Sequence, residues 1–158
     1  MRTTPLALAL GLFASTMAVP TAAQDRGIDP VSVALVERGK AALAAGDYEA
    51  ADDALEAALV ADPANRAAFV AMGRVAMAQE LYGQAVAMTR KALVLEPTDR
   101  DALLVQTEAL VAMGAIERAK ANRERLAKLC PTGCAQLTQS DERIALAAAT
   151  PPATARAN

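Results

Sequence analysis

Apolar and polar residues follow one another along the middle of this chain with the three- and four-residue spacing of amphipathic helices. Residues 66–99 carry two such helical patterns, with a short break at Glu80–Tyr82 and a stop at Pro97. The same arrangement occurs 34 residues earlier, in residues 32–65, and 34 residues later, from residue 100 to about residue 130. A fixed period of this length is typical of helical repeats, in which each repeat is one supersecondary unit. The pattern therefore predicts an all-α solenoid of three helix hairpins.

Three prolines mark the ends of the repeats, because a proline cannot continue the preceding helix but can open the following one. They stand 34 residues apart, at Pro63, Pro97 and Pro131. Small residues occur at fixed offsets before these prolines, with larger ones at two positions of the third repeat: Gly39, Gly73 and Thr107; Ala51, Ala85 and Ala119; Ala58, Ala92 and Leu126. Small side chains at repeated positions predict that paired helices approach each other closely.

These positions carry a resemblance to the tetratricopeptide-repeat family. The segment Gly46–Asn65 resembles the second half of such a repeat, and further positions agree in the next two repeats: Gly73, Tyr82, Ala85, Ala92 and Pro97, then Gly114, Ala119 and Pro131. The resemblance covers about 100 of the 158 residues. It implies a right-handed α-solenoid of three hairpins, at about residues 32–65, 66–99 and 100–131, within a repeat region of residues 30–131.

The segments outside the repeats have other patterns. Residues 1–23 combine a basic start at Arg2, an apolar run over residues 6–19 and small residues at 21–23, as in a secretory signal peptide. We expect export to the periplasm or secretion, with no membrane span after cleavage, since the apolar run is short for a bilayer; an uncleaved anchor is the alternative. The remaining segments are a linker at residues 24–29, a turn and capping helix at 132–149, and a disordered tail at 150–158.

Composition narrows the possible classes of function. The chain contains no histidine, and only 3% of its residues are aromatic. The lack of histidine removes the usual general base, the catalytic triads that depend on it, and most zinc sites. Without residues 1–23 there are 15 basic and 18 acidic residues, a net charge of −3, and this mild charge does not favour nucleic acid. We expect a protein that is not an enzyme and has no cofactor or metal.

The two cysteines of the chain, Cys130 and Cys134, flank a Pro-Thr-Gly sequence. In an exported protein this pair favours a structural disulfide. On a continuous helix their β-carbons would lie too far apart, so the bridge requires a turn, which Pro131 and Gly133 provide. A redox-active pair and a metal site are the alternatives. The spacing resembles the copper-binding loop of the Sco family, although that family also uses a histidine.

The family resemblance also implies a binding face. In tetratricopeptide repeats, ligands lie along the concave face that the first helix of each repeat forms. The corresponding positions here are Val33, Val36, Lys40 and Leu43, then Ala67, Val70, Arg74 and Met77, then Asp101, Leu104, Glu108 and Val111. An alternative interpretation is that several of the apolar residues belong to the core. Apolar side chains with Lys40, Arg74 and Glu108 between them suit an amphipathic or extended peptide.

One subclass of the family grips a C-terminal carboxylate with lysine and asparagine side chains. Those positions hold Val36, Lys40, Ala71, Asp101 and Val105 here, so the resemblance does not extend to this clamp. We therefore expect a scaffold or adaptor that binds a peptide or protein segment on the concave face. The alternative is a thiol-redox or copper-handling protein that uses the cysteine pair, and self-association through an uncovered repeat face is also open.

Overall fold

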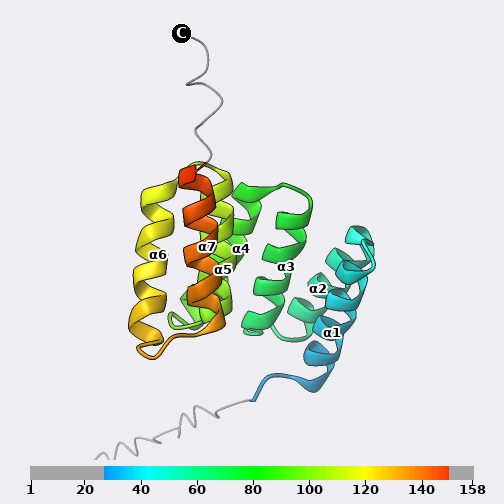
Figure 1. The fold of residues 1–158 in the computed structure, drawn as a ribbon. Helices are drawn as coiled ribbons and strands as arrows, with labels where there is room; N and C mark the ends of the chain where they lie inside the picture. Colours follow the sequence, from blue (N-terminus) through cyan, green and yellow to red (C-terminus); the bar gives the residue numbers. More distant parts are fainter. Residues whose placement is uncertain (1–26, 150–158) are drawn as a thin grey trace, which may run out of the picture.

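Seven α-helices build residues 27–149, the part of the chain that the computed structural model describes (Figure 1). They are α1 (Pro30–Ala44), α2 (Tyr48–Ala61), α3 (Arg66–Ala78), α4 (Tyr82–Leu95), α5 (Arg100–Ala112), α6 (Ile116–Leu129) and α7 (Ala135–Ala149). No strand occurs in residues 27–149, so the predicted all-α class is confirmed. The predicted signal segment, the first residues of the linker and the predicted tail lie outside the described residues.

The first helix of each hairpin begins with a side-chain cap. Asp29 Oδ1 accepts a hydrogen bond from the amide of Val31 at 2.7 Å, and a proline fills the first position of α1. The side chains of Asn65 and Asp99 accept from backbone amides at the starts of α3 and α5 in the same way. Such caps satisfy amides that have no partner within the helix. They explain why these helices begin at equivalent points of the 34-residue period.

Tight turns of one type join the two helices of each hairpin. In each turn a backbone amide donates to the carbonyl oxygen five residues earlier: Asp47 to Ala42, Leu81 to Ala76, and Ala115 to Leu110. This geometry places the preceding residue in the left-handed region, with φ of 78° at Gly46, 60° at Glu80 and 74° at Gly114. Glycine adopts this conformation without strain, but glutamate does not. The second hairpin therefore keeps the turn without its usual glycine.

The small residues at the predicted offsets bring the paired helices together. All nine residues at these three offsets are buried. The approach is closest in the first hairpin, where a β-carbon added to Gly39 would lie only 2.6 Å from Leu55 Cγ. Larger side chains, among them Leu55, Leu103 and Leu126, are fully buried between the helices. Alternation of small and large residues thus produces the dense packing of the solenoid core.

The odd-numbered helices form an inner row and the even-numbered helices an outer row. Helix α1 contacts α3, α3 contacts α5, and α5 contacts α7, whereas α2, α4 and α6 do not contact one another within residues 27–149. Because neighbours are closer in the odd row than in the even row, the stack curves toward the odd row. Helices α1, α3, α5 and α7 consequently lie on the concave side.

Helix α7 continues the inner row and covers the C-terminal end of the repeats. It packs on α5 and α6, and Ile144 contacts the apolar cluster that contains Leu110 and Ala119. Three polar contacts add to this packing: Gln136 with Asp101 at 3.0 Å, Arg143 with Glu108 at 3.2 Å, and Arg123 with Asp141 at 2.6 Å. Solenoids need such an element because the last repeat otherwise exposes an apolar face.

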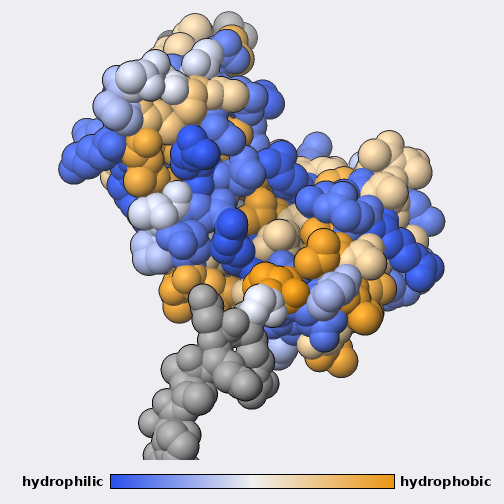
Figure 2. All heavy atoms as spheres, turned by 90° about the horizontal axis from the view of Figure 1, so that it is seen from below, coloured by the Kyte–Doolittle hydropathy of each residue, from blue (hydrophilic) through white to orange (hydrophobic). Residues whose placement is uncertain are grey.

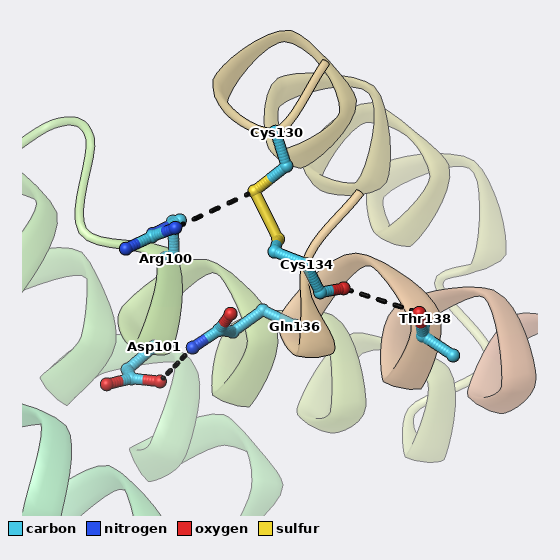
Figure 3. The surroundings of a disulfide bond; sticks show 6 residues. All are labelled: Arg100, Asp101, Cys130, Cys134, Gln136 and Thr138. Carbon is cyan, nitrogen blue, oxygen red and sulfur yellow. Dashed lines mark hydrogen bonds between the residues drawn. A yellow bond between two sulfur atoms is a disulfide. The ribbon is translucent and has the colours of Figure 1, made fainter. Parts of the chain in front are cut away.

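A disulfide joins Cys130 to Cys134 across the turn between α6 and α7 (Figure 3). The two Cα atoms are 5.7 Å apart, and Cys130 is buried. Gly133, with φ of 91°, allows the chain to reverse between them. Thr138 Oγ1 donates a hydrogen bond to the carbonyl oxygen of Cys134 at 3.3 Å, in the first turn of α7. The bridge therefore sets where α7 starts relative to the end of α6.

Candidate functional site

The predicted groove residues fall into three environments according to their position in the repeat. The first set, Val36, Val70 and Leu104, is buried. The second set is charged and at least partly exposed: Lys40, Arg74 and Glu108. The third set is apolar and half-buried: Leu43, Met77 and Val111. Members of a set are 34 residues apart, so the repeat places equivalent residues in the same environment.

Val36 and Leu104 are part of the core and not of a binding groove, which corrects the expectation drawn from the family positions. They are 2% and 4% exposed, and Val36 packs in the cluster that contains Leu55 and Val75. This repeat position points toward the interior of the solenoid, as the core interpretation of the apolar residues predicts. Val70, at the same position of the second repeat, is buried in a cluster with Ala92 but also lines the floor of a hollow.

A hollow of about 500 Å³, the N-terminal hollow, opens between α1, α3 and the start of α5. It is lined by Lys40, Leu43, Ala44, Arg66, Ala67, Val70, Ala71, Arg74, Asp99 and Asp101. Four of the predicted groove residues therefore meet there. A view along the helices, from the end where α1 begins, shows apolar and polar patches mixed over this side of the molecule (Figure 2). A ligand on this surface would meet both kinds of side chain.

Ion pairs order the charged residues of the N-terminal hollow. Arg66 pairs with Asp99, whose other carboxylate oxygen accepts from the amide of Ala102 at 2.8 Å. Arg74 Nη2 lies 3.8 Å from Asp101 Oδ1, a longer and weaker pair. Lys40 pairs with an exposed glutamate of its own helix, outside the hollow. With three basic and two acidic residues, the lining of the hollow has an excess of positive charge.

A smaller polar recess of about 310 Å³ adjoins this hollow and shares Arg66, Asp99 and Asp101 with it. Its other lining residues are Glu96, Thr98, Arg100 and Gln136. Hydrogen bonds from the hydroxyl and then from the amide of Thr98 stabilise the ionised carboxylate of Glu96 and hold its pKa below the ordinary value. The recess extends the charged part of the concave side toward the start of α7.

A second hollow on the concave side, the C-terminal hollow, has a volume of about 490 Å³. Met77, Ala78, Glu80, Tyr82, Glu108, Val111, Ala112 and Arg143 line it. Three predicted groove residues meet there: Met77, Glu108 and Val111. Arg143, from α7, places its Nε 3.2 Å from Glu108 Oε1 across the hollow. With two glutamates and one arginine, this lining has an excess of negative charge, opposite to that of the N-terminal hollow.

Solved structures share this arrangement of helices. The first TPR domain of human RPAP3 matches with a TM-score of 0.68 and 24% identity, over 75% of this chain and 93% of that domain. The chain has the tetratricopeptide-repeat (TPR) fold. The TPR domain of Sgt2 from Aspergillus fumigatus matches with a TM-score of 0.66 and 26% identity, over 79% of this chain and 87% of that one. No protein-family model matches the sequence, and no curated protein matches it.

A third match is a TPR domain solved with a peptide. The first TPR domain of Spaghetti (RPAP3), bound to the HSP90 peptide SRMEEVD, has a TM-score of 0.68 and 22% identity, over 76% of this chain and 97% of that domain. The matches confirm the predicted resemblance to the TPR family at the level of fold.

The cysteine pair of this TPR fold lies at its C-terminal junction, outside the two hollows. Arg100, which lines the polar recess, places Nη1 4.0 Å from Cys130 Sγ, and Figure 3 shows its guanidinium directed toward that sulfur. No group of three histidine, cysteine, aspartate or glutamate side chains suited to a metal ion occurs in residues 27–149. The described part of the site therefore consists of apolar and charged side chains alone.

Sequence reasoning missed lining residues that come from helix ends, turns and α7. The missed residues include Arg66, Asp99, Glu80, Tyr82 and Arg143. Two of the contacts that α7 makes with α5 join residues 35 positions apart, Gln136 with Asp101 and Arg143 with Glu108. A search at 35 as well as 34 residues would have aligned α7 with α5 and placed Arg143 on the concave side.

Proposed function

We propose that this chain is a non-catalytic scaffold or adaptor that binds a peptide or protein segment on the concave side of its TPR fold. The observation that carries the proposal is the presence of two hollows of about 500 and 490 Å³ along the inner row of helices. Each combines half-buried apolar side chains with charged ones. Apolar surface supplies contact area for a segment, and a few charged groups fix its direction and register.

The solved TPR domains support this mode of binding. The first TPR domain of Spaghetti (RPAP3) is bound to an HSP90 peptide, and the second TPR domain of human RPAP3 is in complex with the HSP70 peptide SGPTIEEVD. The present chain lacks the carboxylate clamp, since Val36, Ala71 and Val105 are buried apolar residues at three of its five positions. The fold therefore supports binding of a segment, whereas the lining of the hollows decides which segment.

Export to the periplasm is part of the proposal. It rests on the signal-like pattern of residues 1–23 and is consistent with a disulfide, which persists in oxidising compartments. None of the helices of residues 27–149 has the length and apolarity needed to cross a bilayer. Fractionation of producing cells, with mass determination of the recovered chain, tests the proposal. Recovery from the cytoplasm with residues 1–23 still attached would contradict it.

The binding proposal is tested with two matched charge reversals. Arg74→Glu changes the centre of the N-terminal hollow, whereas Arg90→Glu changes an exposed residue of α4 that lines neither hollow. Wild type and both variants are cross-linked in cells, purified under denaturing conditions and compared by mass spectrometry. We expect a protein that wild type and Arg90→Glu recover equally and that Arg74→Glu loses at least five-fold. Circular dichroism should show the same helix content in all three chains.

Equal recovery of every partner by Arg74→Glu would contradict the concave-side proposal. The alternative function, thiol exchange or copper handling, requires a reduced and accessible cysteine pair. Thiol titration of protein isolated without reductant distinguishes it: the structure, with Cys130 buried in a disulfide, leads us to expect no free thiol before denaturation. Two reactive thiols per chain would favour the alternative.

A further inference from the structure

The two hollows of the concave side differ in charge, although equivalent repeat positions line both. The N-terminal hollow contains Lys40 and Arg74, whereas the C-terminal hollow has Glu108 at the position equivalent to those two residues. The apolar floor is similar in kind, with Leu43 in one hollow and Met77 and Val111 in the other. A segment that crosses both hollows therefore meets opposite electrostatic environments at its two ends.

Glu80 adds a second carboxylate to the C-terminal hollow at a backbone position that suits glycine. Its φ of 60° is left-handed, and the equivalent residues of the other hairpins are Gly46 and Gly114. Such a conformation costs a glutamate more than a glycine. The Glu80 side chain lines the hollow, is exposed, and takes part in no ion pair within residues 27–149. Its charge is therefore available to a ligand.

Arg143 shows how a cation is accommodated in this hollow. Its guanidinium Nε lies 3.2 Å from Glu108 Oε1, and its side chain lines the same space as Met77 and Val111. The arginine side chain is 58% exposed, so it occupies the rim rather than the floor. A long side chain with an apolar stem and a cationic head thus already fits against one of the two carboxylates, and the floor beside it stays open.

We propose that the C-terminal hollow binds an arginine or lysine side chain of the partner segment, next to an apolar residue of that segment. The stem packs on Met77, Tyr82 and Val111, and the cationic head lies between Glu80 and Glu108. The inference rests on the proposed function, because it names the chemistry of one end of the same concave site. It also sets the direction of the segment, with the basic end over α5 and α7 and a less basic or acidic end over α1 and α3.

The probes are three capped peptides that differ at one position: Ac-GSLRLSG-NH2, and the same peptide with norleucine or glutamate in place of arginine. Each is titrated into the isotope-labelled protein, expressed as the full chain, and the amide signals are followed by NMR. We expect the arginine peptide to shift signals of residues 77–82, 108–112 and 143. The glutamate peptide should shift signals of the N-terminal hollow, and the norleucine peptide should bind the C-terminal hollow more weakly than the arginine peptide.

Glu80→Gln tests the charge without changing the size of the side chain. It should weaken binding of the arginine peptide about five-fold, the range of one exposed ion pair, and leave the norleucine peptide unaffected. Glu56→Gln is the matched control, because Glu56 is exposed on α2 and lines neither hollow. Glu80→Gly should weaken the arginine peptide equally but raise Tm by about 2–4 °C, because it relieves the left-handed strain.

Each outcome of the titration decides between the two levels of the proposal. Loss of arginine selectivity in Glu80→Gln but not in Glu56→Gln supports the basic anchor. If the arginine peptide shifts only signals of the N-terminal hollow, or if Glu80→Gln binds it as wild type does, the basic anchor is overturned while concave-side binding stands. If none of the three peptides shifts signals of either hollow, the anchor is overturned and the concave-side proposal loses its support as well.

Discussion

The first and third hairpins differ in how their two helices fit together. In the first, Gly39 on α1 faces Leu55 on α2, and the leucine is fully buried. In the third, the residues at the same repeat positions are Thr107 and Arg123. Thr107 is buried and donates its hydroxyl hydrogen to the carbonyl oxygen of Leu103 at 2.8 Å. Arg123 is directed to α7, where it pairs with Asp141, and so leaves space for the threonine.

The ends of the solenoid differ in the same sense. No helix of residues 27–149 covers the outer side of α1, and Val31 on this helix is 61% exposed. The third hairpin is covered by α7, held by a disulfide and by three polar contacts with α5 and α6. The N-terminal end thus depends on a close apolar fit, whereas the C-terminal end depends on an added helix and on the covalent and polar contacts that hold it.

The largest expected difference comes from truncating the equivalent residues Leu55 and Arg123 to alanine. Leu55→Ala removes a fully buried side chain and should lower the free energy of unfolding by about 3 kcal/mol. Arg123→Ala removes a partly exposed ion pair and should cost less than about 1 kcal/mol. Urea unfolding of both variants, followed by circular dichroism, measures the two values. Similar losses for the two variants would contradict the contrast between apolar and polar hairpins.

The second prediction removes the covalent link of the C-terminal end. The double change Cys130→Ser and Cys134→Ser should lower the free energy of unfolding by about 2 kcal/mol, because the closed loop is short. Its effect should concentrate on α7, so hydrogen exchange should quicken at residues 135–149 before it changes in α1 and α2. Reduction of the wild-type protein provides the control, since it breaks the same bond without changing any residue. Uniformly faster exchange along the chain would show that the bridge does not act on α7 in particular.

Much of this fold could be predicted from the sequence because the physical signals are local and repeated. The caps Asp29 and Asp47 and the prolines fix where helices begin and end, and the small residues fix which helix faces meet. The third hairpin carries weaker signals, since Thr107 and Leu126 replace small residues. It keeps the fold because Arg123 moves aside, and a compensation between two helices cannot be seen in either helix alone.

The concave site could be predicted only in part, for a related reason. Repeat position identified Lys40 and Arg74, which are exposed, but also Val36, which is buried. The period of 34 residues says that residues are equivalent and does not say which way they point. Glu80 and Arg143 were missed because one stands in a turn and the other on a helix displaced by one residue from the period. Both line the hollow whose charge distinguishes it from its neighbour.

The smallest expected effect compares the two glycines at the same repeat position, Gly39 and Gly73. An added β-carbon would lie 2.6 Å from Leu55 Cγ at Gly39, but 3.0 Å from Thr89 Cγ2 at Gly73. Alanine favours helix over glycine by up to about 1 kcal/mol, whereas overpacking a dense core costs about 1–3 kcal/mol. Gly39→Ala should therefore destabilise the protein by about 1 kcal/mol, and Gly73→Ala should change its stability by less than about 0.5 kcal/mol. If urea unfolding finds Gly39→Ala as stable as Gly73→Ala, Leu55 has room to move, and the first hairpin is not the tighter of the two.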